Sequence, residues 1–156
     1  MGQPAKLADI VDALEMADES FFRFLDRRTG EVSVVSNEEW RAAENNDDLS
    51  DYPEWEHESI LKAQEIQSSE HFVGLPSKFE INDYEIMERF SHEYPNQRIS
   101  ERLSVAIRGS GAFRRFREKI VDLNIEDDWR RYQLQAYENL AIEWLESEKI
   151  PFTRAD

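Results

Sequence analysis

The sequence predicts an α+β fold: an N-terminal helix and a β-hairpin, with three or four short strands at most, and a predominantly helical C-terminal half. Two runs rich in aromatic and β-branched residues flank Gly30, a pattern typical of a hairpin. From residue 76 onward, apolar residues recur at helical spacing. The length of 156 residues is that of one domain. We therefore expect a single domain, 1–156, with an α+β part at 1–75 and a helical part at 76–156.

The N-terminal part opens with a helix and the hairpin. Apolar residues at i, i+3, i+4 and i+7 predict a helix from about Lys6 to Met16, with Pro4 in its first turn. The stripe consists of Leu7, Ile10, Val11 and Leu14. Segments 20–27 and 31–36 form the predicted hairpin, because the glycine between them accepts a positive φ. A two-stranded hairpin is marginally stable alone, so it needs helices or a third strand against it.

Two further segments are candidates for that additional strand. The segment 70–76 has strand-like composition and ends in glycine and proline, and 150–152 is an extended tail. Between the hairpin and these segments, Ser36 and Glu39 have the spacing of a capping box and predict a short helix. Pro53 opens the next predicted helix.

The C-terminal half is predicted to contain helices only. Asn82 or Asp83 caps the first of them, and the second ends at about residue 108. The third has an apolar stripe in which we expect Phe113 and Phe116 to be core residues. The last helix, at about 126–147, has an aromatic stripe that we also expect in the core, formed by Trp129, Tyr132 and Trp144.

Composition excludes several classes of protein. The net charge of −15 and the pI near 4.6 argue against general nucleic-acid binding and against binding to anionic membranes. The absence of cysteine excludes disulfides, thiolate metal sites and cysteine nucleophiles. No apolar run is long enough for a membrane span, and the N-terminus does not resemble a signal peptide. We therefore expect a cytoplasmic protein.

The order of segments in the second half resembles one family. The segments are Leu75–Ile81 leading into Tyr84–Phe90, then Ala106–Phe116, and finally Leu140–Leu145. The most distinctive string is Gly-Ser-Gly-Ala-Phe-Arg-Arg-Phe, within the second segment. On these residues the chain resembles uncharacterised protein family 0158, over most of its length. The resemblance implies a bacterial, soluble protein and brings with it no activity, cofactor or catalytic residue.

The segment 108–120 concentrates basic residues in an otherwise acidic chain. Glycines before a helix expose backbone N–H groups, and guanidinium groups bind phosphate or carboxylate through paired hydrogen bonds. The candidate anion- or partner-binding residues are Arg108, Gly109, Ser110, Gly111, Arg114 and Arg115. The segment lacks the lysine of a Walker loop and the third glycine of a dinucleotide fingerprint. The alternative is structural: Gly109 ends one helix, Ser110 caps the next, and the arginines pair with carboxylates.

An acidic stretch at about 44–58 is the second unusual segment. It carries seven carboxylates and His57 but lacks the oxygen-ligand pattern of a calcium loop, so we expect an exposed loop and no metal site. The three histidines form no zinc motif, and no serine lies in a nucleophile elbow. No catalytic residue and no cofactor are therefore assigned.

Three functional hypotheses follow. The leading one is a non-enzymatic interaction or regulatory module that engages an acidic or anionic group through Arg108–Arg117. The second is an acidic inhibitor, antitoxin-like or nucleic-acid-mimicking protein that presents its acidic surface to a basic protein. The third is a small enzyme whose arginines stabilise charge on a phosphorylated substrate.

Overall fold

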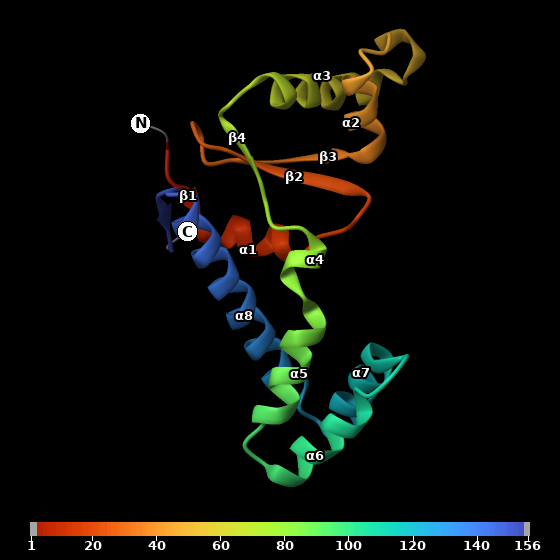
Figure 1. Cartoon of the computed structure of the whole chain (residues 1–156), viewed down its shortest axis with the longest axis vertical. Coiled ribbons are helices and arrows are strands. Elements are labelled where there is room, and N and C mark those ends of the chain that lie inside the picture. Colours follow the sequence, from red (N-terminus) through yellow and green to blue (C-terminus); the bar gives the residue numbers. More distant parts are fainter. Residues whose placement is uncertain (1–2, 155–156) are drawn as a thin grey trace. The chain divides into compact units, whose positions relative to one another are not determined.

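The computed structural model describes residues 3–154, apart from the side chain of Phe79, and has the predicted α+β fold (Figure 1). In chain order the elements are β1 (Ala5–Lys6), α1 (Leu7–Glu15), β2 (Phe21–Asp26), β3 (Val32–Ser36), α2 (Asn37–Glu44), the 3-10 helix η1 (Leu49–Asp51), α3 (Glu54–Ser68), β4 (Phe72–Gly74), α4 (Lys78–Ile81), α5 (Asp83–Glu93), α6 (Gln97–Ala106), α7 (Ala112–Asp122), α8 (Glu126–Ser147) and β5 (Phe152–Thr153). They form two compact units. The first contains the described residues up to Glu80 and those from Ala141 onward, and the second is Ile81–Leu140.

A three-stranded antiparallel sheet lies at the centre of the first unit. Its order is β3-β2-β4, so the predicted hairpin gains the predicted third strand. In Figure 1, α2 and α3 cover one face of this sheet and α1 lies on the other. Val35 is buried against α2 and α3, and Phe24 stacks on Trp40 with ring centroids 5.1 Å apart. The capping box is present as predicted, with Ser36 and Glu39 bonded to each other's backbone N–H groups.

The chain start differs from the sequence prediction. Pro4 does not lie in a helical turn, because the next two residues form β1, which pairs in parallel with β5. Ala5 is completely buried, and its N–H donates to the carbonyl of Pro151 at 2.9 Å. The tail strand is thus confirmed, but its partner is the start of the chain. The short helices α4 and η1 were not predicted either, since so few residues carry no readable periodicity.

The hairpin turn is organised by a buried carboxylate. Asp26 is only 5% exposed, and its side chain accepts hydrogen bonds from the N–H of Arg28 at 2.8 Å and from the Arg28 guanidinium at 3.0 and 3.1 Å. Burial alone would raise the pKa of Asp26, but the hydrogen bonds and charge of Arg28 outweigh it, and the pKa lies below its usual value. The ionised carboxylate therefore stabilises the turn.

We expect Asp26→Asn to lower the stability of the protein at neutral pH by about 1–2 kcal/mol, since it removes charge-assisted hydrogen bonds to a partly exposed arginine. A depressed carboxyl pKa contributes stability above the unfolded-state pKa, and this contribution is lost as the pH falls through the folded-state pKa. The difference in melting temperature between wild type and variant should therefore be largest near neutrality and shrink below about pH 4. Circular dichroism melts across this range measure it; a difference independent of pH would contradict the assignment.

The second unit has its own aromatic core. Phe90 and Phe116 are buried at its centre, with the rings of Trp129 and Tyr132 packed against them. The expectation for Phe113 is wrong, because this residue is 46% exposed; its ring meets that of Tyr84 edge-on. Among residues 3–154, no helix has the length and apolar character needed to cross a membrane.

Candidate functional site

The glycine–arginine segment forms the corner between α6 and α7. Gly109 and Gly111 have φ angles of 75° and 78°, the left-handed conformation that glycine accepts without strain. Ser110 does not cap the following helix, contrary to the sequence prediction. The N-cap position is occupied by Gly111, which has no side chain to accept a hydrogen bond from this helix end.

Arg115 is turned back onto this corner. Its Nε donates to the carbonyl of Ala106 at 2.8 Å, and its two terminal nitrogens donate to the carbonyls of Ser110, at 2.5 Å, and Arg108. These carbonyls belong to the last turn of α6 and the residues just beyond it, where helical partners are missing and the helix dipole favours a cation. Arg115 therefore holds α6 and α7 together at the corner.

The other two candidate arginines remain at the surface. Arg114 is 80% exposed at its side chain, and its Nε lies 3.8 Å from Glu118 one turn further along α7. Arg108 is also exposed. The structure thus divides the predicted cluster into one arginine that serves the corner and two that face solvent.

A groove of about 670 Å³ runs between α6 and α7. Its basic lining residues are Arg98 and Arg102 from α6 and Arg115 and Lys119 from α7. Its acidic lining residues are Glu101, Glu118 and Asp122. Val105, whose side chain is 60% exposed, adds an apolar contact surface.

Sequence reasoning missed Arg98, Arg102 and Lys119 as members of this site, although a signal was present. Arg98 and Arg102 are four residues apart, as are Arg115 and Lys119, so each helix places two like charges on one face. Such pairs repel each other. That both faces line one groove becomes visible only in the structure, where the turn at Gly109 brings α6 and α7 together.

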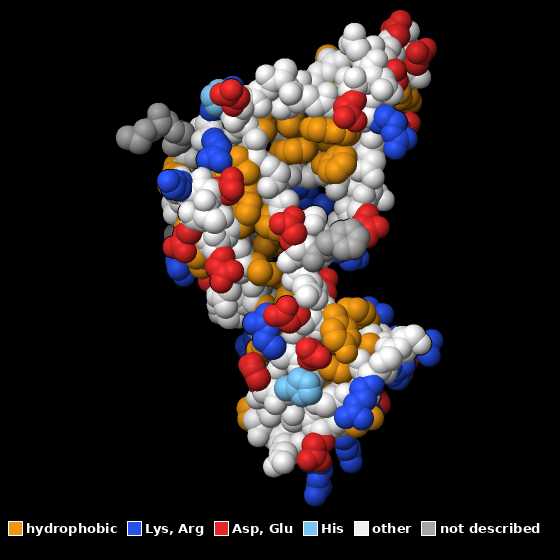
Figure 2. Space-filling model, in the orientation of Figure 1, with side chains coloured by type: hydrophobic (Ala, Val, Ile, Leu, Met, Phe, Trp, Pro, Cys, Tyr) orange, Lys and Arg blue, Asp and Glu red, His pale blue; other side chains and the backbone are white. Residues whose placement is uncertain are grey.

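The region around this groove has the opposite charge to the rest of the chain. Residues 97–119 contain seven basic and two acidic residues, a net charge of +5 in a protein of net charge −15. Figure 2 shows several Lys and Arg side chains over α6 and α7. The local potential around the groove is therefore positive, although the chain as a whole is strongly negative.

The acidic stretch lies in the first unit and has local structural roles. The Tyr52 hydroxyl donates to Asp47 at 2.7 Å, and this hydrogen bond together with burial raises the pKa of Tyr52 to about 12. Asp48 accepts from the N–H of Ser50 at 2.9 Å and caps η1. Within residues 3–154, no three His, Asp or Glu side chains lie close enough together to hold a metal ion.

These features define an α+β protein with a cationic groove on a helical unit. The chain belongs to the Uncharacterised protein family (UPF0158), whose family model matches residues 3–156. The function of this family is unknown, so the family carries no activity over to the chain. No curated protein and no solved structure matches the chain.

Proposed function

We propose that the protein is an interaction or regulatory module whose α6–α7 groove binds an acidic segment of a partner protein. The observation that carries the proposal is the set of basic side chains along this groove. Arg98, Arg102 and Lys119 line it, and none of the three forms an ion pair with any described side chain. Unpaired cations in a protein with a large excess of carboxylates favour an external acidic ligand.

Repulsion between the basic residues supports this assignment. Like charges four residues apart on a helix destabilise it by about 0.2–0.5 kcal/mol per pair. The α6 pair and the α7 pair both incur this cost, and a carboxylate bound between them would relieve it. The charge of the whole chain repels anions at long range, so binding depends on this local patch.

The side chains that line the groove favour a peptide over a free inorganic anion. Val105 exposes apolar surface among the basic groups, which fits a segment that alternates acidic and apolar side chains. The acidic lining residues disfavour a dense anion such as phosphate, since its charge cannot avoid them. Arg115 is assigned a positioning role, because its guanidinium already bonds three backbone carbonyls.

The test uses a fluorescent glutamate-rich peptide of about ten residues with one central leucine, followed by anisotropy. We expect Arg98→Glu/Arg102→Glu to weaken binding at least about tenfold, because two attractive contacts become repulsive. Wild-type affinity should also fall as salt is raised from about 50 to about 200 mM.

The matched control is Arg114→Glu/Arg117→Glu, which changes the net charge equally on the same helical hairpin but outside the groove lining. It should retain affinity within about threefold, because screened charges at this distance act only through the long-range field. Equal losses in both double variants would show that the peptide senses overall charge, and the groove assignment would then fail. An unchanged affinity in Arg98→Glu/Arg102→Glu would also refute it.

A further inference from the structure

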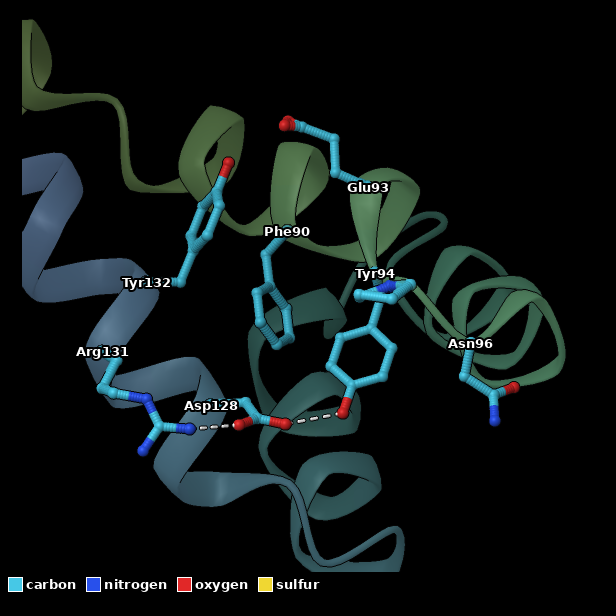
Figure 3. Close-up of a pocket in the computed structure, with 8 residues that line it drawn as sticks. Phe90, Glu93, Tyr94, Asn96, Asp128, Arg131 and Tyr132 are labelled. Carbon is cyan, nitrogen blue, oxygen red and sulfur yellow. Dashed lines mark hydrogen bonds and ion pairs between the residues drawn. The ribbon is translucent and has the colours of Figure 1, made fainter.

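A second concave site in the helical unit has a different chemistry. It lies between the C-terminal end of α5 and the first turns of α8, and its volume is about 570 Å³ (Figure 3). This volume is within the range of sites for small ligands. The rings of Phe90, Tyr94 and Tyr132 line it together with the charged side chains of Glu93, Asp128 and Arg131.

Ring–ring contacts and a hydrogen-bonded carboxylate hold the aromatic walls of this pocket in place. Phe90 is only 4% exposed, and its ring centroid lies 5.4 Å from that of Tyr94 and 5.3 Å from that of Tyr132. The Tyr94 hydroxyl donates to Asp128 at 2.6 Å, and the other oxygen of this carboxylate accepts from Arg131. Figure 3 shows this chain of contacts along one side of the pocket. A ligand would therefore meet aromatic walls that these contacts already fix, which limits the entropy lost on binding.

The electrostatics of the lining select the sign of the ligand. Three charged side chains line the pocket. Arg131 forms an ion pair with Asp128, so the lining has a net charge of −1, which is that of Glu93. Burial raises the pKa of Tyr132, and the charge and hydrogen bond of Glu93 raise it further against the opposing charge of Arg89, so the Glu93 carboxylate acts directly on this wall of the pocket. The faces of aromatic rings attract cations as well. Both contributions disfavour an anion.

We propose that this pocket binds an organic cation, an ammonium group on an alkyl stem, with the stem on the rings of Phe90, Tyr94 and Tyr132 and the charge beside Glu93. Such a group is present in a free diamine and in a lysine side chain. The inference is independent of the acidic-peptide groove, which lies between other helices and requires a ligand of opposite charge.

Titration with 1,5-diaminopentane, followed by isothermal calorimetry and by two-dimensional NMR of the backbone amides, tests the proposal. We expect Glu93→Gln to weaken binding about fivefold, because it removes the unbalanced carboxylate. Arg131→Gln should strengthen binding by a similar factor, because it removes a competing cation and releases Asp128. Glu126→Gln, an exposed carboxyl of α8 outside the pocket, should leave the affinity within about twofold.

A neutral ligand of the same length, 1,5-pentanediol, separates charge recognition from simple apolar burial. Weak or absent binding of the diol, with opposite effects of the two pocket variants, would support the proposal. Equal binding of diamine and diol would overturn it, and so would weaker diamine binding in Arg131→Gln. The proposal would also fail if neither the diamine nor a lysine peptide bound. Tighter binding of a short lysine peptide than of the diamine would identify a protein side chain as the source of the cation.

Discussion

Gly30→Ala is expected to destabilise the protein by about 3–5 kcal/mol, the first of the two largest effects that the structure predicts. Gly30 has φ 75°, a conformation that costs an alanine about 1–2 kcal/mol. A methyl group here would also lie 2.6 Å from the carbonyl oxygen of Pro4 and 3.2 Å from the Cα of Ala5. These are backbone atoms, so the chain start would have to move. Urea unfolding followed by circular dichroism measures the loss in the free energy of unfolding.

Gly109→Ala is the matched control, because Gly109 has the same φ of 75°, but beyond its two chain neighbours no described atom lies within 4 Å of the added methyl group. It should cost only about 1–2 kcal/mol, the backbone contribution alone. Amide exchange gives a second measurement: Gly30→Ala should expose the N–H groups of Gln3 and Ala5, which bond Arg28 and Pro151. Equal costs for both variants, with exchange at the chain start unchanged, would contradict the close approach.

The parts of the fold that the sequence predicted are those that depend on local signals. Local signals were sufficient for the hairpin and the capped helices, because Gly30, Ser36 with Glu39 and Asn82 act within a few residues of themselves. The parallel pair of β1 and β5 joins residues about 147 positions apart, through two residues in each strand. No periodicity can be read from two residues, so this pairing could be found only in three dimensions.

For the candidate site, the sequence located a segment but not the arrangement of its side chains. The sequence singled out the basic segment and the glycine corner as candidates, but it could not distinguish Arg115, which bonds the backbone, from the exposed Arg108 and Arg114. The groove includes Arg98 and Arg102, which lie on the preceding helix. These two arginines line the groove only because the turn at Gly109 brings α6 beside α7. The aromatic pocket was not predicted from the sequence. Its walls come from α5 and α8, which are separated in sequence by α6 and α7.

The second large effect is expected for Phe116→Ala, at about 3–5 kcal/mol. The Phe116 side chain is 1% exposed, and its ring meets Trp129 edge-on at a centroid distance of 4.8 Å and Phe90 at 6.0 Å. Truncation removes buried apolar surface and leaves a cavity that these large rings cannot fill without losing their own contacts. Urea unfolding followed by circular dichroism measures the loss in the free energy of unfolding.

Phe113→Ala provides the comparison on the same helix and in the same predicted stripe. Its side chain is 46% exposed and its ring has one edge-on aromatic contact, so we expect a loss below about 1 kcal/mol. The two phenylalanines are three residues apart, and helical periodicity alone gives both the same role. Similar losses at the two positions would show that the stripe is buried as the sequence suggested. A large loss at Phe116 alone would show that α7 turns its Phe116 face toward Phe90 and Trp129 and leaves Phe113 at the surface.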